Sequence, residues 1–132
     1  MYIGYIPCAF IYKDGEHVHE FKVEFYRRKN GTCPVIEFLD SLDNKMLTKV
    51  LRMIELLEKN GNELREPYTA HVKDGIFELR TIQGNNITRI LYFFVVGKQI
   101  VLTNGFIKKT QKTPKKEIEL ALKYRDDYKS GK

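Results

Sequence analysis

Three stretches rich in β-branched and aromatic residues follow one another closely in the second half of the chain. They cover residues 75–82, 87–96 and 99–106, and the short turns that contain Gly84-Asn85-Asn86 and Gly97-Lys98 separate them. Turns this short and this rich in glycine and asparagine join antiparallel neighbours. The sequence therefore predicts a three-strand antiparallel meander, and this feature limits the possible folds more than any other.

A strand-like segment is also expected near the start of the chain. In the run 17–26, Val23 and Phe25 alternate with charged residues, which is the pattern of a strand with one buried face. A second run, residues 8–13, precedes it across Asp14-Gly15, a strong hairpin signal. Residues 1–20 are therefore expected to add a hairpin to the sheet edge or to contribute to a partner interface.

Two helices are expected between this strand and the meander. Pro34 suits the first turn of a short helix that reaches Leu42. Asp43 can cap a second helix, which Gly61 ends. The inward-facing positions expected on these helices are Val35, Phe38, Leu39, Met46, Val50, Met53, Ile54 and Leu57.

A last helix is expected to begin at Thr113-Pro114, with Thr113 as its cap. Its apolar positions are Ile118, Ala121, Leu122 and Tyr128. The order of strand, two helices, meander and helix predicts an α+β fold, with helices packed on a largely antiparallel sheet. With 132 residues and 42% hydrophobic residues, the chain is expected to form a single domain over residues 1–132.

The cysteines and the start of the chain indicate a cytoplasmic protein. Cys8 and Cys33 match neither a disulfide framework nor a metal-finger spacing, so free thiols in a reducing compartment are expected. The apolar start lacks the positive region of a secretory signal, and no run is long enough to span a membrane. We expect no membrane partner.

Positive charge is concentrated at the end of the chain. Residues 108–132 hold nine Lys or Arg against four acidic residues, a net charge of +5, whereas the whole chain carries +6. A local cationic patch attracts polyphosphates, because each neutralised phosphate releases condensed counterions. Lys112, Lys115 and Lys116 are therefore candidates for binding nucleic acid, with a solvated helix face or docking of an acidic protein as the alternatives.

Two arginines lie within the predicted strands. Arg80 shares a strand face with Glu78 and Ile76, and Arg89 lies in the next strand. A charge among apolar neighbours needs a partner, so Arg80 is expected either to pair with a carboxylate such as Glu78 or to face a phosphate. Lys108 and its neighbour Lys109 follow the third strand, and all four cations could converge at one end of the sheet.

The histidines give weaker signals. His17 and His19 share a strand face but lack a third ligand, so no metal site and no cofactor are expected. His71, with Lys73, lies just ahead of the Arg80 strand and either lines the site or lies on the surface. Tyr92 is expected in the core, with a hydroxyl at the site rim as the alternative. No P-loop, GxGxxG or nucleophile motif is present.

Four segments together resemble the HigB-like, phage-associated branch of the RelE toxin superfamily. They read VEFYRRKNGTCPVIEFLDSL, DGIFELR, RILYFF and GFIKKTQKTPKKEIELAL, and the similarity extends from about Phe21 to Tyr128. The resemblance implies a RelE-like fold and a type II toxin that acts as a metal-independent, ribosome-dependent endoribonuclease on mRNA. It also implies a HigA-like helix-turn-helix antitoxin as partner. The toxin would contact operator DNA only through that antitoxin.

The resemblance assigns roles to individual residues. Arg80, Arg89 and Lys108 match the basic active-site positions, and Lys109 matches a neighbouring basic position. The residues expected to bind RNA or the ribosome are Lys109, Lys112, Lys115, Lys116, His71 and Lys73. Asn104 replaces the histidine of many relatives, and Phe77 replaces a Trp or Tyr.

The implied reaction is attack by a ribose 2′-hydroxyl on the adjacent phosphate. Lys108 could act as base only if nearby cations lower its pKa from about 10.4. Otherwise the ribosome supplies most of the rate by aligning the mRNA, an effect of about 7–11 kcal/mol, and we favour this account. The rival functions are a non-catalytic RNA-binding module and a phage regulatory protein that docks an acidic partner.

Overall fold

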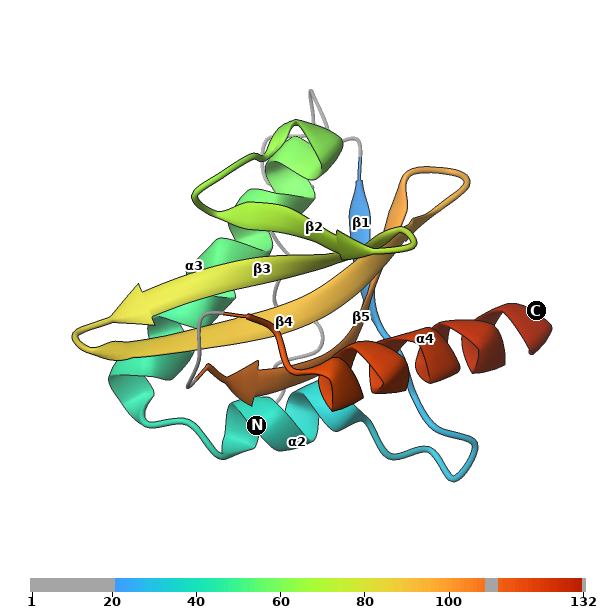
Figure 1. Ribbon diagram of the computed structural model, residues 1–132, viewed down its shortest axis with the longest axis horizontal. Coiled ribbons are helices and arrows are strands. Elements are labelled where there is room, and N and C mark those ends of the chain that lie inside the picture. Colours follow the sequence, from blue (N-terminus) through green and yellow to red (C-terminus); the bar gives the residue numbers. More distant parts are fainter. Residues whose placement is uncertain (1–20, 109–111, 132) are drawn as a thin grey trace, which may run out of the picture.

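The computed structural model describes residues 21–108 and 112–131 of the chain (Figure 1). The expected N-terminal hairpin, His17, His19 and Lys109 lie outside the described residues. The elements in chain order are β1 (Lys22–Phe25), α2 (Pro34–Asp40), α3 (Asn44–Asn60), the 3-10 turn η2 (Gly61–Glu63), β2 (Thr69–Lys73), β3 (Ile76–Gln83), β4 (Asn86–Val95), β5 (Gln99–Ile107) and α4 (Lys115–Ser130).

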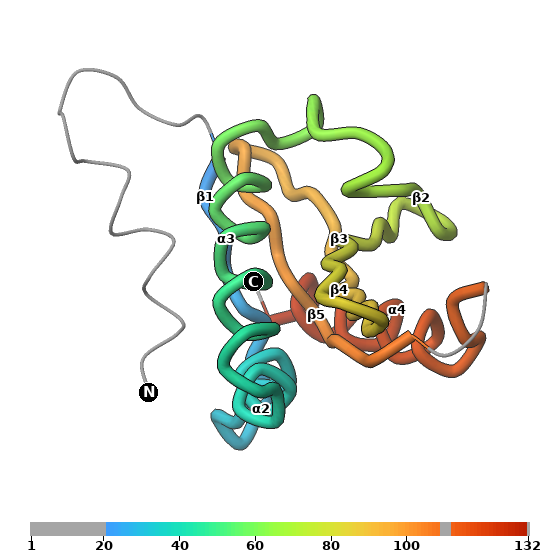
Figure 2. Tube along the Cα trace, turned by 90° about the vertical axis from the view of Figure 1, so that its left-hand side faces the viewer, coloured from blue at the N-terminus to red at the C-terminus, as the bar shows by residue number. Residues whose placement is uncertain are grey.

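The strands form one five-stranded sheet in the order β1-β5-β4-β3-β2. β1 runs parallel to β5, and every other neighbouring pair is antiparallel. The helices α2 and α3 lie on one face of the sheet, and α4 lies on the other (Figures 1 and 2). The predicted α+β class, the largely antiparallel sheet and the helix positions are therefore confirmed. No helix of the described part is both long and apolar enough to cross a membrane.

Strand β2 was not expected from the sequence. Its five residues, TAHVK, lack a run of β-branched residues, and they lie between Pro67 and the first predicted strand of the meander, in a segment to which the sequence pattern assigns no element. The strand is held by its antiparallel pairing with β3 at the edge of the sheet, interrupted by a register shift between His71 and Lys73. Tertiary pairing, not local propensity, makes this segment a strand.

Each face of the sheet has its own apolar core. The larger core lies under α2 and α3, and it includes the alternating strand residues Val23 and Phe25. The smaller core lies under α4 and contains Ala121 and the unpredicted Tyr124. Tyr92 is 1% exposed in the larger core, as expected, and its burial raises the pKa of its hydroxyl to about 12.

The two expected helices between β1 and β2 begin where the sequence predicts. Asp43 caps α3, since its Oδ1 accepts a hydrogen bond of 2.8 Å from the backbone N–H of Met46. Gly61 ends that helix with a φ of 56°, which favours glycine. The helix α2 ends at Asp40, before the predicted Leu42, and the Ser41 hydroxyl donates a hydrogen bond to the carbonyl of Phe38 there.

A β-bulge in β5 determines which side chains face α4. Leu91 pairs with Asn104 while Tyr92 pairs with Leu102, so Thr103 is an extra residue that reverses the alternation of β5. Asn104 consequently faces α4, and Gly105 faces α2. A Cβ on Gly105 would lie 2.4 Å from Cδ2 of Phe38, so glycine permits α2 to pack closely on the strand.

The C-terminal half of α4 is held to the strand β1 and the residues after it by two tyrosine–carboxylate hydrogen bonds. The Tyr26 hydroxyl donates to Asp127 at 2.5 Å, and the Tyr128 hydroxyl donates to Glu24 at 2.8 Å. Burial, aided by these carboxylates, raises the pKa of each tyrosine to about 12. The ring of Tyr124 stacks on that of Tyr26. These contacts fix α4 across the sheet.

Candidate functional site

Arg80 of β3 and Arg89 of β4 lie directly opposite each other in the antiparallel register. Their strand neighbours Leu79 and Ile90 point into the larger core under α2 and α3. Because side chains alternate along a strand, Arg80 and Arg89 face α4 on the other side of the sheet. Like charges on a directly opposed pair repel each other. A nearby anion must therefore offset the repulsion in the folded protein.

Glu78 is that anion, and it is buried between the two arginines. Its Oε2 accepts hydrogen bonds from Arg80 Nε at 3.0 Å and from Arg89 Nη1 at 2.5 Å. Its Oε1 accepts one from the Thr113 hydroxyl at 2.5 Å. The salt bridge between Arg80 and Glu78, one of the two alternatives expected from the sequence, is therefore present, and Glu78 also forms a salt bridge with Arg89.

The pKa of Glu78 lies below its ordinary value. Burial alone would raise the pKa, but hydrogen bonds from Thr113 and Arg89, the charge of Arg89 and the hydrogen bond from Arg80 together lower it. Glu78 is consequently ionised at neutral pH and offsets one of the two positive charges. The cluster of Glu78, Arg80 and Arg89 keeps a net positive charge.

The two arginines differ in exposure and hence in what they can bind. The Arg89 side chain is 6% exposed, and its Nη1 is bonded to Glu78 and to the Thr113 hydroxyl. The Arg80 side chain is 27% exposed and holds Glu78 through Nε. Arg80 is thus oriented by Glu78 with the outer part of its guanidinium open to a ligand, whereas Arg89 is enclosed.

Lys108 lies at the end of β5 on the same face. Its backbone N–H donates to the carbonyl of Ile87 at 2.7 Å, which extends the pairing with β4 by one step. Partial burial lowers the pKa of its amino group, and the charges of Arg89 and Arg80 lower it further, while Glu78 opposes them. The structure thus brings together Arg80, Arg89 and Lys108, three of the four expected cations.

The start of α4 is attached to this cluster. Thr113 was expected to cap the helix, but Pro114 occupies the N-cap position and no side chain caps it. The Thr113 hydroxyl bonds to Glu78 and Arg89 instead. One turn further on, Asn104 donates from Nδ2 to Glu117 Oε1 at 3.0 Å, so Asn104 holds α4 to the sheet.

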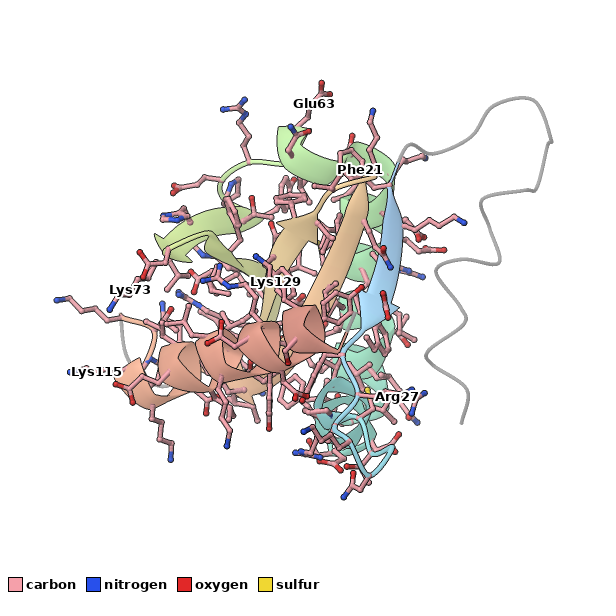
Figure 3. All side chains as sticks on the ribbon, turned by 90° about the vertical axis from the view of Figure 1, so that its right-hand side faces the viewer. Phe21, Arg27, Glu63, Lys73, Lys115 and Lys129 are labelled. Carbon is pink, nitrogen blue, oxygen red and sulfur yellow. The ribbon has the colours of Figure 1, made fainter. Side chains whose placement is uncertain are left out.

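Lys73, Lys112, Lys115 and Lys116 are all exposed. Lys115 and Lys116 begin α4, and Lys73 lies on β2, paired with Ile76. Figure 3 shows Lys73 and Lys115 extending from the same side of the molecule.

His71 does not join the cluster. It pairs with Phe77, which faces the larger core, so it lies on the opposite face of the sheet from Arg80. Its Nε2 accepts a hydrogen bond from the backbone N–H of Gly75 at 3.1 Å, and its ring packs edge-on against Phe77. The surface alternative for His71 is therefore the one that the structure supports.

Sequence reasoning named Glu78 as a possible partner of Arg80 but missed its ion pair with Arg89, and it missed the contacts of Thr113 altogether. The parity of β3 did place Glu78 beside Arg80, which was the available signal. Nothing in the local sequence indicated that Thr113 would leave the cap position for a residue 35 positions earlier. Within the described ranges no group of three or more His, Cys, Asp or Glu residues could hold a metal. The absence of a metal from the reaction stays a prediction.

The arrangement can bind and polarise a phosphodiester. An arginine held by its Nε can still present its remaining N–H donors to a phosphate. A lysine with a lowered pKa can donate or accept a proton more readily than an ordinary lysine. The buried carboxylate fixes the geometry before a ligand arrives, which is the arrangement that stabilises developing charge most effectively.

Two of the three comparisons with known proteins found similar proteins. Residues 37–126 match the family described as phage derived protein Gp49-like (DUF891). One chain of the archaeal RelE–RelB complex from Pyrococcus horikoshii OT3 is 18% identical, covers 71% of this chain and 99% of its own length, and gives a TM-score of 0.45. No curated protein sequence matches.

Proposed function

The chain belongs to the phage-derived Gp49-like family, a family of RelE/HigB-type toxins, and on this premise we propose that it is a ribosome-dependent endoribonuclease that cleaves mRNA. The observation that carries the proposal is the pairing of Arg80 with Arg89 across two strands, with Lys108 beside them. Such a group of cations on one sheet face fits the charge that develops on a phosphate during cleavage.

In the proposed reaction the 2′-oxygen of a ribose forms a bond to the adjacent phosphorus, and the bond from phosphorus to the 5′-oxygen breaks. Arg80 binds the phosphate oxygens through the exposed part of its guanidinium and stabilises the pentacovalent phosphorane. The 2′-hydroxyl loses its proton as the new bond forms, and the 5′-oxygen takes up a proton as it leaves. Lys108, with its lowered pKa, accepts the first proton or donates the second, and water completes the other transfer. The ribosome aligns the mRNA, which contributes about 7–11 kcal/mol through orientation.

Arg89 and Glu78 act as positioning residues in this proposal. Both are buried: Glu78 contacts Arg80 and Arg89, and Glu78 and Arg89 each contact the Thr113 hydroxyl. Glu78 holds the Arg80 side chain in one orientation, and Arg89 keeps Glu78 ionised by hydrogen bonding and charge. The exposed lysines Lys73, Lys115 and Lys116, with Lys112 and the undescribed Lys109, are proposed to contact the RNA or ribosome.

We further propose that a small antitoxin with a helix-turn-helix domain binds and inhibits the protein in the cytoplasm, where ribosomes and mRNA are available. Contact with operator DNA would occur only through that antitoxin. A non-catalytic RNA-binding module would use the same cations to hold phosphate, without cutting.

Expression of the chain alone, followed by growth measurement and sequencing of mRNA 5′ ends, tests the proposal. We expect growth arrest and new 5′ ends inside coding regions, both abolished by Arg80→Ala. Arg52→Ala is the matched control, because Arg52 is an exposed arginine on α3, on the other side of the sheet. Arrest without new 5′ ends would contradict the endoribonuclease, and the absence of arrest would favour a passive binder.

A further inference from the structure

The β3–β4 hairpin carries an exposed isoleucine next to the cationic cluster. Ile82 is 58% exposed, although it lies within a regular strand two residues beyond Arg80. Its partner across the hairpin is Ile87, which is half-buried and lies two residues before Arg89. The two side chains place an apolar surface, half of it open to solvent at Ile82, beside the cations, where a ligand that carries an apolar part next to an anion can cover it.

The two isoleucines share the face of the arginines. Thr81 and Thr88, the neighbouring pair, point to the other face, where the Thr88 hydroxyl contacts Sδ of Met46 on α3 at 3.8 Å. Strand alternation therefore directs Ile82 and Ile87 to the side of Arg80.

Lys108 lies next to this aliphatic pair. Its backbone N–H donates a hydrogen bond to the carbonyl of Ile87, and the positive charges of both arginines act on its amino group. Beyond the isoleucines the hairpin turn, Gly84 to Asn86, contains no charged residue. From the middle of the hairpin toward its turn, this face therefore presents first the cations that can bind a phosphate and then the apolar surface of the two isoleucines.

We propose that Ile82 and Ile87 form a base-binding subsite for single-stranded RNA, which receives the base of the nucleotide next to the phosphate held by Arg80 and Lys108. The proposal deepens the function proposed above and rests on it for the identity of the ligand. A nucleotide joins an anionic phosphate to a flat base, and its two parts match the two adjacent surfaces in charge and polarity. The isoleucines would then influence which base stands at the cleavage site.

A binding measurement tests the subsite without depending on cleavage. Short 5′-labelled single-stranded RNAs, each with one abasic position, are titrated with the purified protein at low salt and followed by fluorescence anisotropy. With wild-type protein, removal of the base at one position should weaken binding about five-fold, the effect of burying part of an isoleucine side chain. With Ile82→Ser, the intact and abasic RNAs should bind equally.

Ile107→Ser is the matched control. Ile107 is also an exposed isoleucine near the hairpin end, at 47%, but it pairs with Thr88 and so lies on the opposite face. This variant should keep the abasic effect of the wild type. Circular dichroism and urea unfolding of both variants establish that neither loses its fold.

Two results would overturn the subsite. In the first, Ile82→Ser keeps the same abasic effect as the wild type. In the second, Ile82→Ser leaves RNA binding unchanged but weakens binding of the antitoxin, which would make the isoleucines a protein interface. Failure of the proposed endoribonuclease would instead appear as absent cleavage by wild-type protein, a result separate from the anisotropy series.

Discussion

Replacement of Arg80 by alanine is expected to abolish growth arrest while leaving the fold nearly intact. Arg80 gives Glu78 one hydrogen bond, and its side chain is 27% exposed. After the change Glu78 still accepts hydrogen bonds from Arg89 and Thr113. A charge-assisted hydrogen bond contributes about 1.5–3 kcal/mol, less when exposed to solvent, so we expect a loss of about 1 kcal/mol in the free energy of unfolding.

Arg89→Ala is expected to be far more destabilising. Arg89 is 6% exposed and is the buried cation paired with Glu78, so its removal leaves a buried carboxylate with weaker compensation. Breaking a buried ion pair by removal of one partner costs about 3–5 kcal/mol. Although the two arginines lie opposite each other in the sheet, their alanine variants should therefore differ clearly in free energy of unfolding.

Urea unfolding of the purified proteins, released from their antitoxin, measures both effects. Arg52→Ala serves as the exposed control, and its unfolding midpoint should match that of the wild type. Arg80→Lys should remain folded and lose arrest as well, because lysine keeps the charge but lacks the planar fork. If Arg80→Ala is as destabilised as Arg89→Ala, or if arrest persists in the folded variant, Arg80 is a structural ion-pair residue and the reasoning is refuted.

Three further outcomes are expected. Because the pKa of Glu78 is lowered in the folded protein, the stabilisation it contributes should be full above its unfolded pKa and disappear as the pH falls through the folded value. The difference in unfolding free energy between wild type and Glu78→Gln should therefore shrink only in acid, as urea titrations from pH 7 to 3 would show. The double variant Lys115→Gln, Lys116→Gln should weaken RNA binding most at low salt, and it should reduce the slope of log K against log salt by about 0.7 per lost contact. The control double variant Lys45→Gln, Lys59→Gln on α3 should change neither the affinity nor the slope. Co-expression with the proposed antitoxin, which the family resemblance expects to be encoded by the adjacent gene, should yield a stable complex that buries on the order of 1,200–2,000 Å² or more. Elution of the chain alone at micromolar concentration would count against an antitoxin.

The sequence predicted the elements whose signals are local. The hairpin turns, the Asp43 cap and the alternation of Val23 and Phe25 each depend on residues close together in the chain, and each is confirmed. Strand β2 was missed because its five residues form no run or alternation of strand formers, and it is held by pairing with β3. Its existence depends on a partner that the local pattern does not specify.

The composition of the site was partly predictable for the same reason. Arg80, Arg89 and Lys108 converge as expected, because strand parity and short turns determine which side chains share a face. The bulge at Thr103 was not predictable from periodicity, and it sets the side to which the following residues point. The contact from Thr113 to Glu78 likewise depends on how α4 packs over the finished sheet.

Cleavage of a single mRNA in a purified translation system tests the central claim most directly. Primer extension would map the 5′ ends after addition of wild-type protein, Arg80→Ala or Arg52→Ala. We predict cuts within the coding region for wild type and Arg52→Ala only when ribosomes are translating, and none for a folded Arg80→Ala. Intact mRNA with wild-type protein, or unchanged cuts with Arg80→Ala, would contradict an endoribonuclease that acts through Arg80.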